Sequence, residues 1–499
     1  MQKYYLGIDQ GTTGTAALLF DENWNLSSRG YREISQIYPN PGWVEHDPVE
    51  ILDSTMAAVG EALAGASITP EEIACIGIDH EGESIVIWDE MTGMPVYNSI
   101  VWQDRRTART ADSITEDHGD EIFMITGLNP DAYFSATKLQ WIIENIPEAK
   151  ELLAAKRLLA GTVDTWLTWK LTGGKVFVTD ASTASRTMLY DLAKGDWSPE
   201  LIELFGLRGV KLPEIHDSFE VFGATDSSTF PSSGIPISAI LVDQQAALLG
   251  QNCTANGSVK TTYGTGCFML MNIGQSPVFP DNGLLNTVAW QEGGRKTYAL
   301  DGGIYIGGAA IQWLRDGLRI IDDATETEQM AVKAGSNGGM YFVPAFTGLA
   351  APHWDSYARG TIVGITAGIT REHLVRATLE SIAFQVYDVL EVMHSCSGFT
   401  FPMMRADGGV SRNNFLMQFQ SDILNMPIEV PVIPETSALG VAYAAALGAG
   451  LIGSLDDVSE KWRLGRRFEP NISKDERAGL IREWHRAVER SKAWAIEAE

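Results

Sequence analysis

Two short apolar runs near the N-terminus constrain the fold more than any other feature of this sequence. Residues 4–8 and 16–20 have the composition of buried strands, and a polar stretch rich in glycine and threonine separates them. Two strands joined in this way predict a β-hairpin. A second pattern of the same kind occurs at residues 259–272, around residues 263–266. We therefore expect two related halves, each built around one hairpin.

The rest of the chain predicts an α/β protein with two domains. A chain of 499 residues is too long for one core. Further strands are expected at residues 73–78, 84–88 and 235–242, and a helix at 47–63. Mixed strands and helices of this kind indicate the α/β class. We place the domain boundary near residue 250, which predicts domains 1–250 and 251–499.

The last segment predicts an amphipathic helix that packs on the body of the protein. Ser473 and Glu476 have the spacing of a capping box, and apolar residues then recur at helical spacing. We expect this helix to cover residues 473–495 and to have a structural role.

Composition narrows the classes of partner. The net charge of −27 repels nucleic acid and anionic membranes, so neither is an expected partner. No apolar run approaches the ~20 residues that span a bilayer, and the first residues lack a signal-peptide pattern. The four widely spaced cysteines fit free thiols in a reducing compartment. We expect a cytoplasmic protein, and the histidines show no zinc-binding spacing.

The first hairpin connection has the composition of a phosphate-binding turn. Its glycines let backbone amides approach phosphate oxygens, and its threonine hydroxyls add donors. Asp9, at the end of the strand, can hold Mg²⁺ through water. A tight turn without any ligand is the alternative. Walker-A spacing and protein-kinase signatures are absent from the sequence.

Several motifs in order along the chain resemble those of the FGGY family of carbohydrate kinases, and most of all its glycerol kinases. Residues 9–13 resemble the phosphate loop of the actin/hexokinase/Hsp70 superfamily, and residues 41–48 resemble a stretch typical of glycerol kinases. Residues 133–141 and 360–380 fit the two FGGY signatures. Residues 263–268 and 407–414 resemble the nucleotide-binding turns of the family. The similarity runs from about residue 4 to beyond residue 450.

This resemblance implies two ribonuclease-H-like domains around a catalytic cleft, with the polyol mainly on the first and ATP on the second. It implies a magnesium-dependent transfer of the γ-phosphate to a hydroxyl of glycerol or a related small polyol or sugar. Asp243 matches the catalytic aspartate, which accepts the proton of the attacking hydroxyl. A helix N-cap is the alternative role for Asp243. The family also implies a homo-oligomer, a dimer or a tetramer.

The resemblance assigns further site residues by position. The substrate-binding set comprises His80, Glu83, Trp102, Tyr133, Asp243, Gln244 and Phe268. The nucleotide-binding set comprises Thr12, Thr13, Thr265, Gly308, Gln312, Gly409 and Asn413, and Asp9 is the metal-binding residue. An aromatic wall with a few acceptors suits a polyol, which has an apolar face and hydroxyl edges. Taken singly, Trp102 and Phe268 would be core residues, and each glycine a turn or a cap.

Three positions depart from the glycerol-kinase pattern. Gly82 replaces an arginine that donates to two glycerol hydroxyls, which predicts a roomier pocket for a longer polyol or a differently held triol. Ala16 replaces an arginine, so either another basic residue substitutes or turnover is modest. Gly234 replaces the arginine that binds fructose 1,6-bisphosphate in regulated bacterial members, so regulation of that kind is not expected.

Three other functions remain open from the sequence. One is an FGGY kinase for a C4–C6 polyol or ketose. Another is a catalytically weakened FGGY protein that acts as a sensor or binding protein. The third is a nucleotide-switch module such as an actin-like or Hsp70-type ATPase, which shares the first hairpin but lacks the FGGY signatures.

Overall fold

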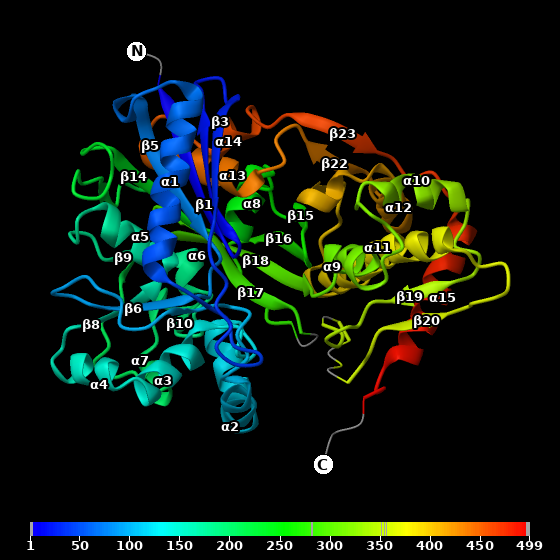
Figure 1. Cartoon of the computed structure of the whole chain (residues 1–499), viewed down its shortest axis with the longest axis horizontal. Coiled ribbons are helices and arrows are strands. Elements are labelled where there is room, and N and C mark those ends of the chain that lie inside the picture. Colours follow the sequence, from blue (N-terminus) through cyan, green and yellow to red (C-terminus); the bar gives the residue numbers. More distant parts are fainter. Residues whose placement is uncertain (1–2, 281–282, 351, 354, 356, 496–499) are drawn as a thin grey trace.

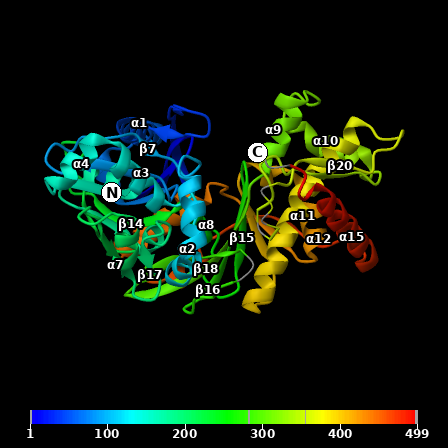
Figure 2. The ribbon, with the colours of Figure 1, turned by 90° about the horizontal axis from the view of Figure 1, so that it is seen from below.

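The computed structural model describes residues 3–280, 283–350, 352–353, 355 and 357–495. The first two and last four residues of the expected domains 1–250 and 251–499 therefore lie outside the described residues. Two lobes lie side by side, and each is built around one mixed β-sheet with helices on its faces (Figures 1 and 2). The expected α/β architecture with two related halves is confirmed.

The first sheet contains the N-terminal hairpin at its centre. Strands β1 and β2 are antiparallel, and β5 and then β14 continue the sheet parallel to β1. The strand order is β13 (Gly223–Ala224), β14 (Pro236–Val242), β5 (Ile73–His80), β1 (Tyr4–Gly11), β2 (Gly14–Phe20) and β3 (Leu26–Glu33). Helix α1 (Pro48–Ala66) packs on β2 and β3, and Asp47 caps it by accepting a hydrogen bond from the Val49 amide.

The second sheet repeats this plan. Strands β15 and β16 form an antiparallel hairpin, and β21 and then β22 continue the sheet parallel to β15. The strand order is β17 (Leu285–Glu292), β18 (Arg295–Ile304), β16 (Cys267–Gly274), β15 (Val259–Tyr263), β21 (Met404–Asp407), β22 (Ile428–Pro431) and β23 (Leu464–Phe468).

Two helices lie between the sheets. Helix α8 (Asp243–Gly250) follows β14 directly, and α13 (Thr436–Gly448) packs on α8 and on β1, β5 and β14. The helices approach closely because glycines face the partner backbone. A Cβ on Gly440 would lie 1.8 Å from the Ala246 carbonyl oxygen, and one on Gly250 would lie 2.0 Å from that of Thr436. A helix from late in the chain therefore covers the first sheet.

A smaller sheet and several helices complete the N-terminal lobe. Its strands are β4 (Glu45–His46), β7 (Ser99–Ile100), β6 (Ile85–Asp89) and β8 (Leu158–Thr162). Two strand pairs join β12 (Glu214–His216) to β9 (Val178–Asp180), and β10 (Tyr190–Asp191) to β11 (Asp196–Trp197). The helices are α2 (Ala108–Thr126), α3 (Ser135–Asn145), α4 (Pro147–Ala154), α5 (Val163–Leu171), α6 (Ala181–Ala184) and α7 (Pro199–Leu204), with a 3-10 turn at Pro70–Glu72.

Helices dominate the remainder of the C-terminal lobe. They are α9 (Gly308–Gln312), α10 (Glu326–Ala334), α11 (Arg371–Ser397), α12 (Asn414–Leu424), α14 (Leu455–Ser459) and α15 (Lys474–Ser491). A π-helical turn (Trp313–Gly317), a 3-10 turn (Gly409–Arg412) and the pair β19 (Tyr341–Val343) and β20 (Thr361–Val363) complete it. No helix among the described residues is both long and apolar enough to cross a bilayer.

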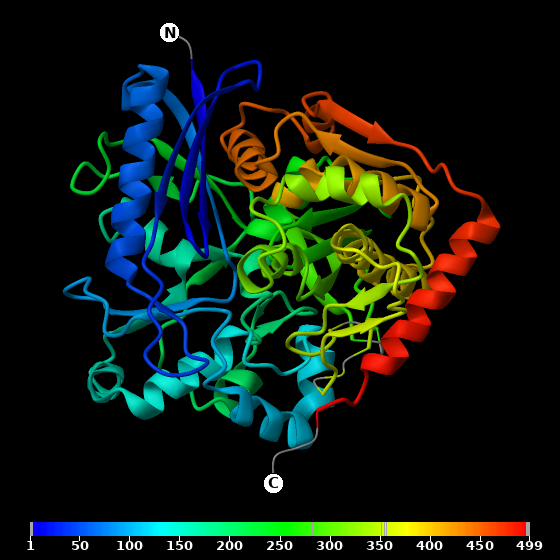
Figure 3. The same cartoon turned by 45° about the vertical axis from the view of Figure 1, so that its right-hand side comes forward.

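Helix α15 runs along the edge of the C-terminal lobe (Figure 3). The Ser473 hydroxyl caps it by accepting a hydrogen bond from the Glu476 amide at 3.2 Å. Trp484 stacks on Phe384 of α11 at 5.2 Å between ring centroids, and its indole donates to Asp388 at 2.8 Å. The helix ends at Ser491, before the expected residue 495, because Lys492 adopts an extended backbone conformation.

Candidate active site

Two carboxylates face each other where the first sheet ends. Asp9 of β1 and Asp79 of β5 are register partners on adjacent parallel strands. Burial, with a further contribution from Asp243, raises the pKa of Asp9 to about 6, while a hydrogen bond from Asp79 opposes this rise. Burial and the charge of Asp9 raise the pKa of Asp79 well above its usual value. Burial and the repulsion between these neighbouring acids therefore oppose the ionisation of both carboxyls.

Asp243 lies at the electrostatic centre of the site. It occupies the first turn of α8, directly after β14, and its Oδ1 accepts a hydrogen bond from the Gln244 amide at 2.6 Å. Burial raises the pKa of Asp243, while hydrogen bonds from Gln244 and the charge of Lys260 oppose the rise. The charge of Asp243 in turn raises the pKa values of other site residues, namely Asp9, Asp79, Glu83 and Tyr133.

Three aromatic rings form a wall that draws on both lobes. The ring centroids of Trp102 and Tyr133 are 5.6 Å apart, and those of Trp102 and Phe268 are 6.4 Å apart, both with edge-on geometry. The Trp102 indole donates to the Thr12 hydroxyl at 2.9 Å. Phe268 lies on β16, whereas the other two rings belong to the N-terminal lobe. The wall therefore connects the two lobes and the first hairpin turn.

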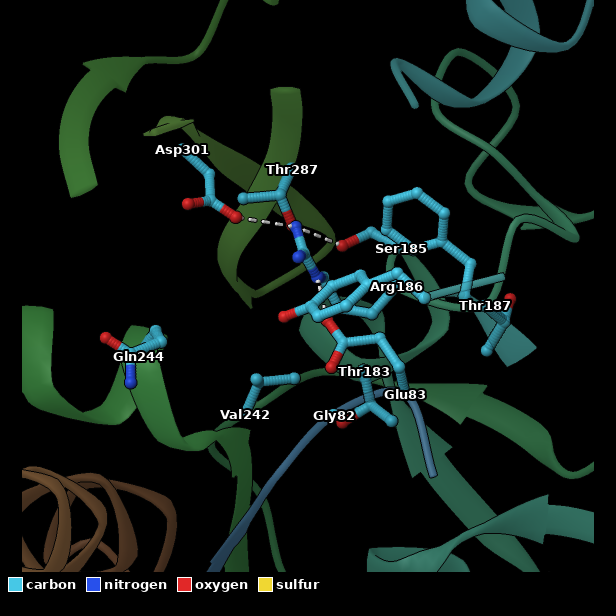
Figure 4. A network of polar contacts seen from close by, with 12 residues as sticks. Gly82, Glu83, Thr183, Ser185, Arg186, Thr187, Val242, Gln244, Thr287 and Asp301 are labelled. Carbon is cyan, nitrogen blue, oxygen red and sulfur yellow. Dashed lines mark hydrogen bonds and ion pairs between the residues drawn. The ribbon is translucent and has the colours of Figure 1, made fainter. Parts of the chain in front are cut away.

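Glu83 is buried beside this wall and pairs with an arginine. The Arg186 Nε donates to Glu83 Oε1 at 2.6 Å, and Arg186 Nη1 lies 3.0 Å from Asp301 Oδ2 on β18 (Figure 4). Burial raises the pKa of Glu83 to about 7, and Arg186 limits the rise. The same two carboxylates raise the pKa of Arg186, which stays charged.

His80 and Gln244 make their hydrogen bonds within the protein. The His80 ring accepts from the Gly82 amide at Nδ1 (3.2 Å) and contacts the Thr183 hydroxyl at Nε2 (3.0 Å). The Gln244 side chain donates to Asp243 at 3.1 Å and accepts from Lys260 at 2.5 Å. Both ring nitrogens of His80, a predicted substrate-binding residue, are therefore already engaged within the protein. The Gln244 side chain supports Asp243.

The predicted nucleotide-binding residues lie on turns that follow central strands and on α9. Thr13 and Thr265 are exposed at the turns of the two hairpins, and Gln312 is exposed on α9. The Gly308 amide donates to the Gly264 carbonyl at 2.8 Å, which ties α9 to the second hairpin turn. A Cβ added at Gly409 would meet no atom within 4 Å.

Asn413 has a structural role in this arrangement. Its side chain caps α12 by accepting from the Leu416 amide at 3.0 Å, and it donates to the Thr327 hydroxyl at 3.1 Å. A nucleotide contact through this side chain would have to compete with both hydrogen bonds.

Comparison with known proteins identifies the family. Residues 4–250 match the N-terminal domain of the FGGY family of carbohydrate kinases, and residues 259–449 match its C-terminal domain. The chain belongs to the FGGY family of carbohydrate kinases. It is 52% identical over 493 residues to glycerol kinase 2 of Thermotoga maritima, a match that covers 99% of each chain. It is 50% identical over 498 residues to a glycerol kinase of Petrotoga mobilis, which covers 100% of both.

Solved structures of carbohydrate kinases share this fold. A crystal structure of Plasmodium falciparum glycerol kinase with ADP matches with a TM-score of 0.92 at 35% identity, and covers 100% of this chain and 99% of that one. A gluconate kinase from Lactobacillus acidophilus matches with a TM-score of 0.87 at 22% identity, which shows a common fold.

Gly82 of this FGGY kinase borders side chains from distant parts of the sequence. Gly82 is buried with φ +76°, and a Cβ added there would lie 2.9 Å from Val242 Cγ1 and 3.8 Å from Arg186 Cγ. Figure 4 shows Val242 and Arg186 near Gly82. The first atom of a side chain at position 82 would therefore press on Val242 of β14, while Arg186, from the segment after α6, lies within van der Waals range.

Four residues that shape the site were not among the assigned site residues. Asp79 directly follows the predicted strand 73–78 and lies on β5, and Lys260, in the predicted hairpin 259–272, is fully buried with its pKa lowered by burial. Arg186 and Asp301 meet across 115 positions of sequence. A charged residue at the end of an apolar strand, as at Asp79, is the one local signal that could have identified a member of this group.

Proposed function

We propose that this FGGY carbohydrate kinase transfers the γ-phosphate of ATP to a hydroxyl of glycerol. Identity of about half over the whole chain to proteins named glycerol kinases carries the proposal.

Asp243 has the properties of a general base for this reaction. Its carboxylate lies in the first turn of α8, and burial gives it a raised pKa, which makes it a stronger base. Hydrogen bonds from Gln244 fix its orientation. We propose that it accepts the proton of the attacking hydroxyl. Phosphoryl transfer otherwise depends mainly on alignment and charge neutralisation.

The polyol would be held between hydrogen-bonding and apolar groups. Glu83 would accept from hydroxyls, while Trp102, Tyr133 and Phe268 would contact the carbon chain. Residues 1–250 would bind the polyol and residues 251–499 the nucleotide, with the exposed threonines of the hairpin turns and α9 near the phosphates.

The donor set around Asp9 fits Mg²⁺. Asp79 is fully buried, its two oxygens accept no hydrogen bond from any described donor, and Asp9 and Asp243 are carboxylates nearby. Magnesium prefers such oxygen ligands and keeps several waters. No group of three or more histidine, cysteine or acidic residues in the described ranges could hold a metal by itself. Asp9 would hold Mg²⁺ that arrives with ATP, and the ion would neutralise phosphate charge.

The test is ADP release by the purified chain with Mg²⁺, ATP and a panel of C3–C6 polyols and ketoses. We expect glycerol to have the highest kcat/KM. A higher kcat/KM for a longer substrate would overturn glycerol as the substrate but would retain the assignment as a kinase. Binding of polyols without any turnover would instead indicate a sensor.

We further expect a cytoplasmic dimer or tetramer.

A further inference from the structure

Arg186 is a buried guanidinium held between the two lobes. It follows α6, it is 3% exposed, and it contacts Glu83 of the first lobe and Asp301 of the second. The neighbouring Ser185 hydroxyl lies 2.8 Å from the Thr287 hydroxyl of β17 (Figure 4). These contacts fix the position of the side chain without any ligand.

The guanidinium has more donors than the protein uses. A guanidinium carries five N–H donors, and among the described residues the structure records one hydrogen bond, from Nε to Glu83. Nη1 is buried without a hydrogen-bond partner, as is Asp301 Oδ1, even though Nη1 and Asp301 Oδ2 are 3.0 Å apart. Buried polar groups are normally satisfied, so this surplus indicates a polar ligand.

The unused N–H donors of Arg186 lie at the proposed polyol site. The guanidinium carbon is 5.7 Å from the ring centroid of Tyr133 and 5.5 Å from that of Phe134. Tyr133 belongs to the aromatic wall, and Glu83 is a proposed acceptor for the polyol. The Arg186 stem also borders Gly82, which offers no side chain. Donors of Arg186 and acceptors of Glu83 and Asp301 therefore lie together beside Tyr133.

We propose that Arg186 binds the substrate directly, by donating a hydrogen bond from its Nη atoms to one hydroxyl of a small vicinal polyol. This inference rests on the proposed function and deepens it, because it makes Arg186 a determinant of selectivity among three-carbon polyols. A site built to donate to a hydroxyl rejects an analogue that lacks it, since the donor is then left buried and unpaired.

A purely structural role is the competing explanation. As a bridge between Glu83 and Asp301, Arg186 would affect all polyols alike. As a substrate ligand, it would affect glycerol and any diol that keeps the contacted hydroxyl, and would spare the diol that lacks it. Propane-1,2-diol lacks a terminal hydroxyl and propane-1,3-diol lacks the central one, so the pair separates the two roles.

The experiment compares wild type with Arg186→Lys, which keeps a positive charge beside Glu83 and loses the planar fork. The control is Arg106→Lys, because Arg106 is also buried, pairs with Glu45 and Asp104, and packs over Trp43. For each protein, kcat/KM and the calorimetric dissociation constant are measured with glycerol and both diols.

We expect wild type to discriminate against one diol by about 10- to 100-fold, the range of a charge-assisted hydrogen bond. In Arg186→Lys this discrimination should fall at least about fivefold, while Arg106→Lys should leave the ratio unchanged. An equal loss for all three polyols, or unchanged discrimination, would overturn the inference alone. A wild type that neither binds nor phosphorylates any of the three would overturn the proposed function with it.

Asp301→Asn provides a second variant if Arg186→Lys does not fold. It leaves the Glu83–Arg186 pair intact and weakens only the second anchor of the guanidinium. Discrimination between the diols should then fall by a smaller factor, about twofold or more. Discrimination equal to wild type in folded Asp301→Asn would contradict the inference.

Discussion

The hairpins β1–β2 and β15–β16 occupy equivalent places in their sheets, yet they carry opposite charges. Each pairs with a parallel strand, β5 in the first lobe and β21 in the second. On the first pair of strands the register partners Asp9 and Asp79 are acids, whereas on the second Lys260 and Arg405 are bases.

The two hairpins have different electrostatic roles because their charges differ. Arg405 is neutralised locally, since it ion-pairs with Glu429 at 3.5 Å and packs over Trp462. Lys260 donates to Gln244 and Thr262, and its charge lowers the pKa of Asp243. The first hairpin thus concentrates negative charge for a cation, and the second supplies a cation that tunes the base between them. One backbone plan serves both tasks because the side chains decide the electrostatics.

The largest expected effect comes from removing the base between the hairpins. Asp243→Asn keeps the shape of the side chain but cannot accept the hydroxyl proton, so kcat should fall by about 10²- to 10⁴-fold with polyol binding retained. Steady-state kinetics and calorimetry measure the two properties. Asp388→Asn, a buried carboxylate at the α11–α15 contact, is the control and should lower thermal stability only. A variant of Asp243 with more than a third of wild-type kcat would remove it from the base role.

Removing the cation of the second hairpin should change the pH dependence. Lys260 lowers the pKa of Asp243, so Lys260→Met should raise that pKa. The acid limb of the pH profile of kcat/KM should then move to higher pH by about one unit, which means roughly tenfold lower activity on that limb. Lys296→Met, a half-buried lysine on β18 that bonds to the Leu192 carbonyl, is the matched control. An unchanged acid limb would show that the charge of Lys260 does not control the pKa of Asp243.

The turns after the two parallel strands should differ in their tolerance of a side chain. Gly82 (φ +76°) and Gly408 (φ +84°) follow β5 and β21. A Cβ at Gly408 would lie 2.5 Å from the Tyr263 carbonyl oxygen, whereas one at Gly82 would lie 2.9 Å from a side-chain atom, Val242 Cγ1. We expect Gly408→Ala to destabilise by about 2–4 kcal/mol and Gly82→Ala by about 1–2 kcal/mol.

Thermal unfolding measures this difference between the two turns. Gly398→Ala is the control for backbone strain alone, because Gly398 has φ +69° and open space around it. Equal destabilisation by Gly82→Ala and Gly408→Ala would show that close approach to the backbone does not distinguish the turns.

The smallest expected effect concerns the acidic pair of the first hairpin. The pKa of Asp9 is raised to about 6, so the folded protein binds more protons than the unfolded chain between about pH 4 and 6. Stability therefore falls as pH rises through this window, and a full shift corresponds to at most about 3 kcal/mol.

Asp9→Asn should recover part of that loss. Because Asp9 is partly exposed, we expect a gain of about 1 kcal/mol at pH 7.5, which corresponds to roughly 2 °C in the melting temperature. The gain should disappear toward pH 4, and the Mg²⁺ concentration needed for half-maximal activity should rise. Destabilisation by the same amount at every pH would contradict the raised pKa.

Local patterns predicted much of the scaffold. The apolar runs at residues 4–8 and 16–20 became β1 and β2, and Asp47 and Ser473 cap α1 and α15. These features depend on neighbours in sequence, so propensity and periodicity suffice to predict them. The family motifs carried the candidate site in the same way, and the structure brings Asp9, Asp243 and Glu83 within electrostatic reach of one another.

The sequence by itself determined the α/β class, the two hairpins and the family, because each depends on patterns of residues that are contiguous in the sequence. Only the tertiary structure decided which side chains surround position 82. Val242 and Arg186 come from elsewhere in the chain and lie beside Gly82, where an added Cβ would meet them at 2.9 and 3.8 Å. The meeting of Arg186 with Glu83 and Asp301 depends on packing between lobes, and no local pattern specifies which distant charges will share a buried site.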